Sequence, residues 1–283
     1  MRHTRAVRSI VVVALLCRSA AAEPAKSAVD KLVRAAVATV SASMLADRAV
    51  IDIYGVDESK DLVAVNALRS HGAGGKITRK LDPRGVTVIA DDTAGAAWFV
   101  APYALDIVDT PMDVQEVHAR ERVTGLALRT GDTWRLAGLL YARTMPDKEL
   151  MDPANLSTAA DAIPIAAQLV GDAAVGGEVR GWFPAGLAKA AAPGVALLAS
   201  GTQASELATT TAASLKLAAA WDALKLVPDQ IHASLFSDGK LAFVTATIYL
   251  PRKPGPGAVR MSVAIVATRT AKGWRWVSLQ FSA

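Results

Sequence analysis

The chain has 283 residues, of which 52% are hydrophobic and 20% are charged, and its formal net charge is +5. This length is enough for two ordinary domains with substantial cores. Four arginines and no acidic residue lie in residues 1–22, so the rest of the chain holds 27 basic and 26 acidic side chains. That balance, without any lysine and arginine cluster, excludes the usual electrostatic footprint of nucleic-acid binding. Cys17 is the only cysteine, which excludes disulfides, thiolate metal sites and a cysteine nucleophile from the remainder.

Residues 1–22 have the layout of a secretory signal peptide. Arginines come first, then the apolar run Ile10–Cys17, then three alanines at 20–22 that suit a signal peptidase. The apolar run is far shorter than the roughly 20 residues that span a bilayer, and no later run approaches that length. We therefore expect cleavage after this segment, a periplasmic or secreted protein, and no transmembrane segment after cleavage. Two alternatives stay open: an uncleaved membrane anchor, and a lipid anchor on Cys17, although a leucine rather than a small residue precedes it.

Residues 23–143 predict a first domain that begins with a helix. Apolar residues at helical spacing form one stripe over four turns, and Ser27 is suited to cap it; the stripe is Val29, Leu32, Val33, Ala36, Val37, Val40 and Met44. A short strand at Ala49–Tyr54 and a second helix at Asp61–Ser70 follow. The domain then continues with the predicted strands Gly85–Ala90, Ala96–Leu105, Val117–Thr130 and Thr133–Ala142.

Residues 144–157 form a proline-containing linker, and residues 158–283 predict a second domain with a similar order of elements. We expect a helix at Ala159–Trp182, a short strand at Val195–Ala199 and a helix from Ser205 to Leu224. Four strands close the chain, at Gln230–Phe236, Leu241–Leu250, Val259–Thr270 and Trp274–Ser282. Helices first and then a run of antiparallel strands is an α+β signature rather than βαβ alternation.

The closing hairpins of the two predicted domains repeat each other in sequence. At a fixed offset of 140 residues, eight of 23 positions from Arg120 onward are identical, including Trp134 with Trp274. An upstream block, Gly95 to Val100, aligns with Gly239 to Val244 at an offset of 144. We therefore predict two divergent copies of one domain, the alternative being that two amphipathic hairpins look alike.

The closing block Arg269-Thr-Ala-Lys-Gly-Trp274-Arg-Trp-Val-Ser-Leu-Gln-Phe-Ser282 resembles the end of a SnoaL-like domain of the nuclear-transport-factor-2-like superfamily. The resemblance implies two tandem cone-shaped α+β domains, each with helices packed in a curved antiparallel sheet. Activities in that superfamily range from polyketide cyclases, steroid isomerases and dehydratases to noncatalytic binding domains, so the resemblance leaves function open.

Three side chains are candidates for ligand binding: His118, Arg120 and Arg260. His118 shares strand parity with Arg120, and the alternative for it is a salt-bridge cluster at a strand edge. Arg120 and Arg260 occupy equivalent positions in the two copies. Either could hold an anionic ligand by paired hydrogen bonds, and the alternative is an ion pair at a strand start.

Other features of the sequence favour no chemistry. His71 lies in a glycine-rich loop and His232 on the polar side of its strand, and neither has the spacing of a zinc site. Trp134 and Trp274 are predicted to pack in cores. No phosphate-binding loop and no Gly-x-Ser-x-Gly elbow is present, so we predict no catalytic residue, no metal and no cofactor.

The sequence therefore favours an exported noncatalytic module that binds a small hydrophobic or anionic ligand, or a partner protein. The alternative is a small isomerase, cyclase or dehydratase that uses one cone for a hydrophobic substrate. Neither face of the strand from Val259 to Thr270 is strongly charged, so the face turned away from its helices would leave an apolar patch. We expect the tethered first copy to cover it, sheet against sheet, in an intramolecular pseudo-dimer that is a monomer in solution.

Overall fold

The computed structural model describes residues 23–53, 62–69, 75–110, 116–144, 168–184, 186–202, 206–251 and 258–282. The expected signal segment with Cys17, the linker beyond Thr144, and His71 lie outside these ranges. Within the ranges, no helix has the length and apolar character needed to cross a bilayer.

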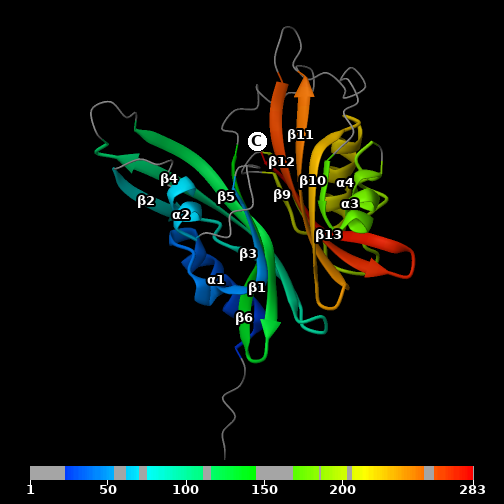
Figure 1. Cartoon of the computed structure of the whole chain (residues 1–283), viewed down its shortest axis with the longest axis horizontal. Coiled ribbons are helices and arrows are strands. Elements are labelled where there is room, and N and C mark those ends of the chain that lie inside the picture. The colour runs from blue at the N-terminus through cyan, green and yellow to red at the C-terminus, as the bar shows by residue number, and fades with distance from the viewer. Residues whose placement is uncertain are drawn as a thin grey trace, which may run out of the picture.

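The first half of the chain builds one sheet with two helices on its outer side (Figure 1). Its elements are α1 (Ala25–Ala38), a short 3-10 helix η1 (Ala42–Met44), β1 (Leu45–Ile53), α2 (Leu62–Arg69), β2 (Lys76–Leu81), β3 (Thr87–Asp91), β4 (Ala96–Val108), β5 (Val117–Thr130) and β6 (Thr133–Arg143). The strands lie in the order β1-β6-β5-β4-β2, and β3 also pairs with β4. Only the β1–β6 pair among them is parallel. We call this the first sheet.

The second half builds a second sheet, again with helices on its outer side. Its elements are β7 (Gln168–Gly171), α3 (Ala173–Arg180), β8 (Leu198–Ser200), β9 (Leu207–Ala208), α4 (Thr211–Asp222), β10 (Pro228–Phe236), β11 (Leu241–Pro251), β12 (Ala258–Thr270) and β13 (Gly273–Ser282). The strand order is β7-β10-β11-β12-β13-β8-β9. Both halves thus combine helices with a largely antiparallel sheet, as the α+β prediction required.

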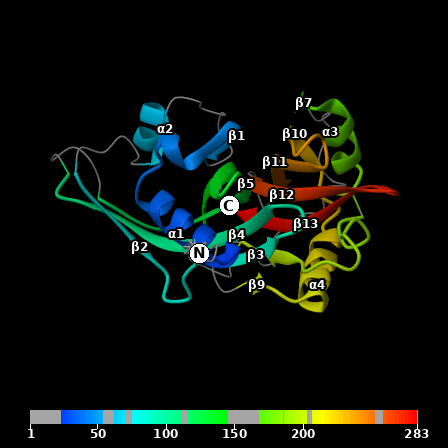
Figure 2. The ribbon, with the colours of Figure 1, turned by 90° about the horizontal axis from the view of Figure 1, so that it is seen from below.

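The two sheets pack face to face (Figures 1 and 2). One hydrophobic cluster joins the core of the second half to side chains of the first sheet, namely Ala96, Trp98, Val100, Leu126, Ala137, Leu140 and Ala142. A second cluster packs α1 against the opposite face of the first sheet. Because the first sheet is covered on both faces, β4 is buried without alternation from Ala96 to Tyr103.

Gly138 in β6 allows the sheets to approach closely. A Cβ at this position would overlap the ring of Phe243, which reaches across from β11. The aromatic ring of one sheet therefore rests on bare backbone of the other, and any side chain at position 138 would push the two sheets apart.

The first helix is shorter than predicted. It ends at Ala38 rather than near Met44, and Thr39 is already extended with φ −155°. The sequence there is Thr39-Val40-Ser41, and β-branched and hydroxyl-bearing residues weaken helices. Ser27 does not cap the helix, because Pro24 holds the N-cap position and the Ser27 hydroxyl donates to Glu23 instead.

The long helix predicted at Ala159–Trp182 is wrong over its described part, where the chain forms β7 and then α3. Gly171 separates them with φ +82°, a left-handed conformation that favours glycine. Asp172 then caps α3, because its Oδ1 accepts a hydrogen bond from Val175 N at 2.9 Å. Asp172 and the glycine before it thus start a new helix instead of lying inside a long one.

Other elements also differ from the prediction, and β1 begins at Leu45 rather than at Ala49. Thr210 rather than Ser205 caps α4, since its hydroxyl accepts from Ala213 N at 3.3 Å, and Leu207–Ala208 form β9 where a helix was expected. β8 begins at Leu198, later than predicted. The sequence analysis did not predict β2, whose residues alternate between exposed and half-buried. Its three basic side chains suit an edge strand.

The closing hairpins of the two halves have the same register. Arg129 pairs with Trp134 and Arg269 with Trp274, and both ladders shift at one place, after Leu126 and after Val266. All these equivalences keep the offset of 140. The upstream strand differs from the prediction, because Trp98 pairs with Leu126 whereas Phe243 pairs with Val266.

The structural offset between β4 and β11 is therefore 145 rather than 144. The main-chain N–H of Arg129 donates to Gly95 O, and that of Arg269 donates to Lys240 O. Gly95 is therefore equivalent to Lys240, the residue after Gly239, and not to Gly239 itself. A one-residue shift moves a side chain to the other face of a sheet. The equivalent of Phe243 is thus Trp98, and both face the opposite sheet.

Candidate functional site

The interior of the second half is packed with large apolar side chains. Trp221 stacks on Phe281 with ring centroids 4.2 Å apart, and Trp276 is fully buried with its Nε1 donating to Leu187 O at 2.6 Å. Among the described residues of this half, no charged side chain is buried. The described part of this interior is therefore apolar and aromatic.

The interior of the first half is polar by comparison. Arg69 is buried over the ring of Tyr141, 4.1 Å from its centroid, and donates to Val37 O at 2.5 Å. The Tyr141 hydroxyl donates to Ala36 O at 3.1 Å, and burial raises the pKa of Tyr141. These bonds tie α2 and the sheet to the end of α1, so the pair has a clear structural role.

A buried carboxylate and a tyrosine meet between β4 and β5. The Tyr103 hydroxyl donates to Glu121 Oε2 at 2.7 Å, and both side chains are almost completely buried. Both residues line a small pocket of about 210 Å³ at one end of the first sheet. That volume is below the roughly 300–1,000 Å³ of typical ligand pockets.

Arg122 in β5 is a buried cation that crosses between the two sheets. Its Nη1 donates to Ser200 Oγ at 2.5 Å and its Nε to Ser282 Oγ at 3.1 Å. Its Nη2 donates to the carbonyls of Gly201 and Phe281. Burial lowers the pKa of Arg122 to about 9, which leaves the guanidinium charged at neutral pH. Because every nitrogen is engaged within the protein, we assign Arg122 a structural role.

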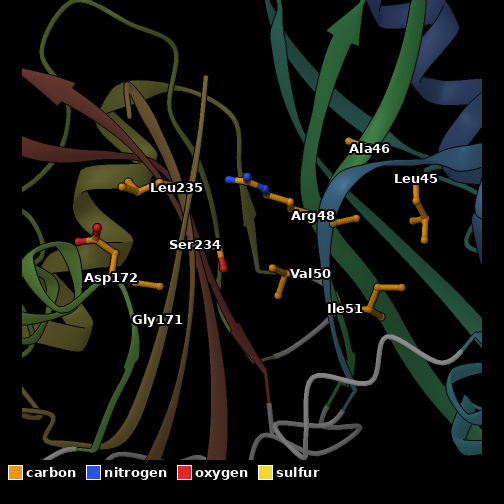
Figure 3. A pocket seen from close by; sticks show the side chains of 11 residues that line it. Leu45, Ala46, Arg48, Val50, Ile51, Gly171, Asp172, Ser234 and Leu235 are labelled. Atoms are coloured by element: carbon orange, nitrogen blue, oxygen red, sulfur yellow. The ribbon is translucent and has the colours of Figure 1, made fainter. Parts of the chain in front are cut away.

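A groove of about 790 Å³ opens between the β1 edge of the first sheet and the second sheet (Figure 3). Six residues of β1 between Leu45 and Ile51 form one wall, and residues 171–172 and 233–235 form the other. A neighbouring hollow of about 720 Å³ shares Leu45, Ala46, Arg48 and Leu235 with it. We call the two together the seam groove.

Arg48 is a charged side chain that lines both hollows of the seam groove. Figure 3 shows it extending from β1 toward the second sheet. It is exposed and has φ +61°, in a segment where β1 leaves its ladder with β6 between Leu45 and Val50. Among the described residues, the recorded hydrogen bonds and ion pairs leave its guanidinium without a partner. A non-glycine residue in this left-handed conformation is strained, so the surrounding structure must hold Arg48 in place.

The seam groove also contains acidic side chains, since Asp47 and Asp238 line its smaller hollow. Asp172 is engaged as the cap of α3. Leu235 is an exposed large hydrophobic residue, and the Val50 side chain points into the groove in Figure 3. The larger hollow therefore combines the Arg48 cation with apolar surface and a carboxylate engaged as a helix cap, whereas the smaller hollow carries charges of both signs.

The three side chains singled out from the sequence lie apart from this groove. His118 is exposed, its Nδ1 donates to Asp106 Oδ1 at 2.9 Å, and this hydrogen bond raises the pKa of His118. Arg120 is exposed at the rim of the 210 Å³ pocket. Arg260 is exposed on β12 opposite Tyr249, at the position equivalent to Arg120 opposite Ala104. The structure thus brings Arg120 to a cavity and His118 to a surface ion pair.

Sequence reasoning missed Arg48 and Arg122. Arg122 has the same strand parity as Arg120, so the row of basic residues on β5 was a signal that one of them faces the second sheet. No pattern in the sequence indicates that Arg48 has a left-handed backbone within a strand. Within the described ranges, no three histidine, aspartate or glutamate side chains gather as a metal site requires.

No family model and no curated protein matches this chain. Solved structures of similar fold include an uncharacterised cystatin-like-fold protein of Caulobacter vibrioides (16% identity, 45% of this chain and 95% of that chain, TM-score 0.35). A second is a Shewanella frigidimarina protein provisionally assigned as a ketosteroid isomerase (16% identity, 41% of this chain and 100% of that chain, TM-score 0.33). A third is an NTF2-like protein with a cystatin-like fold from Novosphingobium aromaticivorans (13% identity, 45% of this chain and 79% of that chain, TM-score 0.30). With TM-scores this low, the likeness carries no argument about what this chain does.

Proposed function

We propose that this protein is an exported, noncatalytic binding module that holds a small amphipathic anion in the seam groove. The observation that carries the proposal is Arg48, an exposed cation on a strained backbone that extends into a groove of about 790 Å³. An anionic group would pair with its guanidinium. The apolar part of the ligand would cover Val50 and Leu235.

The groove has the size and chemistry that such a ligand needs. Its volume falls within the roughly 300–1,000 Å³ range of small-molecule sites. A non-glycine residue at positive φ costs of order 1–3 kcal/mol, so the surrounding structure must hold it. Surface that gathers one exposed leucine, one valine and one cation in a hollow is suited to a ligand with a charged head and an apolar body.

We further propose that the chain consists of two tandem SnoaL-like copies of the nuclear-transport-factor-2-like superfamily, arranged as a pseudo-dimer and monomeric in solution. Support comes from the common register of the closing hairpins, including the ladder shift after Leu126 and after Val266. Export rests on the layout of residues 1–22. N-terminal sequencing of the exported protein should begin within a few residues of Glu23, and intact Met1 in the cytosol would contradict it.

Isothermal titration calorimetry with laurate tests the groove directly, because laurate has one carboxylate on an apolar chain. We expect saturable binding, and about tenfold weaker binding in Arg48→Gln because a charge-assisted hydrogen bond is lost. Arg180→Gln, an exposed arginine at the end of α3, is the matched control and should leave the affinity unchanged. Dodecanol, which lacks the charge, should bind equally to both forms. Equal laurate affinity in Arg48→Gln and the native chain would reject the proposal.

The enzyme alternative has one observation in its favour, the buried Tyr103–Glu121 pair beside a pocket. Glu121 would be the base, with Tyr103 orienting it. Deuterium exchange at the α-carbon of cyclohexanone in D₂O, followed by NMR, tests this reading. Exchange that is accelerated by the native chain and lost in Glu121→Gln would favour the enzyme over the module.

A further inference from the structure

A second pocket, distinct from the seam groove, lies where the end of β2, the middle of β4 and the first part of β5 meet the residue after β6. Its volume is about 210 Å³. Pro83, Pro102 and Ala104 contribute apolar walls, and Lys80 and Arg120 are cations at its edge. The pocket is therefore small, partly apolar and bordered by positive charge.

Thr144 lines this pocket and is 3% exposed. Its main-chain N–H donates to Arg120 O at 2.8 Å, but its buried hydroxyl has no hydrogen-bond partner in the described structure. Buried hydroxyls are nearly always paired, so an orphaned one in a cavity wall points to a partner that the protein itself does not supply. A bound water or a ligand oxygen would meet that need.

The acidic side chains around the pocket already have partners. Asp82 accepts from Arg84 Nε at 2.8 Å, and this hydrogen bond holds the pKa of Asp82 below its usual value. Glu121 accepts from the Tyr103 hydroxyl at 2.7 Å. The side chains of Lys80 and Arg120 make no hydrogen bond or ion pair within the described ranges. The Tyr103 hydrogen bond leaves the charge of Glu121 in place, and Arg120 also attracts the Asp82 carboxylate. The three cations Lys80, Arg84 and Arg120 nevertheless outnumber the two carboxylates Asp82 and Glu121, so the net charge around the pocket is positive.

We propose that this pocket binds a small carboxylate of about the size of benzoate. One carboxylate oxygen accepts from the Thr144 hydroxyl and the other pairs with Arg120, while Lys80 adds positive potential at the mouth. The ring packs against the proline and alanine walls. This site is independent of the seam groove, so either could fail without the other.

Calorimetric titration of the full chain with sodium benzoate is the test. We expect saturable binding that becomes about tenfold weaker in Arg120→Gln and in Thr144→Val, since each variant removes one hydrogen bond to a charged group. Arg129→Gln changes an exposed arginine on the same strand and should leave the affinity unchanged. Benzyl alcohol, without the charge, should bind far more weakly than benzoate.

Thermal unfolding separates a ligand site from a structural role for Thr144. If the hydroxyl has no partner in the ligand-free protein, Thr144→Val should raise the melting temperature while weakening benzoate binding. A lower melting temperature would show that the hydroxyl is already paired within the protein and would overturn the proposal. So would the absence of saturable binding, which would indicate that the pocket holds water only. Laurate binding through Arg48 should be unaffected in both variants, which keeps the two proposals distinguishable.

Discussion

The closing hairpins of the two halves have the same strand register, but the two halves bury different kinds of side chain. Among the described residues, every buried charged side chain belongs to the first half, namely Asp52, Arg69, Glu121 and Arg122. The second half instead buries aromatic residues, with Trp276 at its centre and Trp221 stacked on Phe281. The same pattern of backbone hydrogen bonds is thus compatible with either a polar or an aromatic interior. The pocket of about 210 Å³ and the buried Arg122, which reaches between the two sheets, both belong to the first half.

The largest expected effect on stability comes from replacing Arg122. Arg122→Ala should lower the free energy of unfolding by about 3–5 kcal/mol, because it leaves buried acceptors in the second half unpaired. Urea denaturation followed by tryptophan fluorescence measures this. Arg120→Ala, two residues away on the same strand and exposed, should change stability by no more than about 0.5 kcal/mol. Similar losses in the two variants would contradict the assigned role of Arg122.

The close approach of the sheets gives the next effect. Gly138→Ala should cost up to about 3 kcal/mol, because the new methyl group overlaps the Phe243 ring. Gly177→Ala is the matched control, since a Cβ there meets nothing within 4 Å inside α3. It should stabilise the protein by roughly 0.5–1 kcal/mol through helix propensity. Melting temperatures of the two variants should therefore move in opposite directions.

The polar interior of the first half predicts a difference between two tyrosines. Tyr103→Phe should cost about 2 kcal/mol, because the Glu121 carboxylate loses a buried donor. Tyr141→Phe removes a bond to the neutral carbonyl of Ala36 and should cost about 1 kcal/mol. Chemical denaturation of both variants in parallel measures the difference. Equal costs would argue that Glu121 is neutral or otherwise paired.

The smallest effect concerns the exposed pair of His118 and Asp106. The hydrogen bond from His118 to the Asp106 carboxylate raises the pKa of His118 in the folded state. Its contribution to stability is therefore fully present below the unfolded pKa of about 6.5 and is lost as the pH rises through the folded value. NMR titration of the imidazole should show a lower pKa in Asp106→Asn. An unchanged pKa would mean that the pair does not form in solution.

The sequence located β5, β6 and β10 to β13 within about two residues, because period-two alternation and turn residues mark these strands. It missed β2, β7 and β9. Helix boundaries were predicted poorly where alanine-rich stretches carry little pattern, as from Ala159 to Trp182. The predicted offset between β4 and β11 was wrong by one residue because it matched Gly95 with Gly239 by identity. The pairing of the strands shows that the offset is 145. The sequence did not reveal the candidate site, because the orientation of Arg48 depends on its backbone conformation and the groove forms only when the two sheets pack together.

Chemical-shift mapping of laurate on ¹⁵N-labelled protein tests the binding proposal most directly. The account predicts that saturating laurate shifts amide resonances of β1 from Leu45 to Ile51 and of Ala233–Leu235 in β10, the two walls of the seam groove. The helix-covered interior around Tyr141 should stay unperturbed. Shifts confined to that interior, with the groove walls unchanged, would contradict the account.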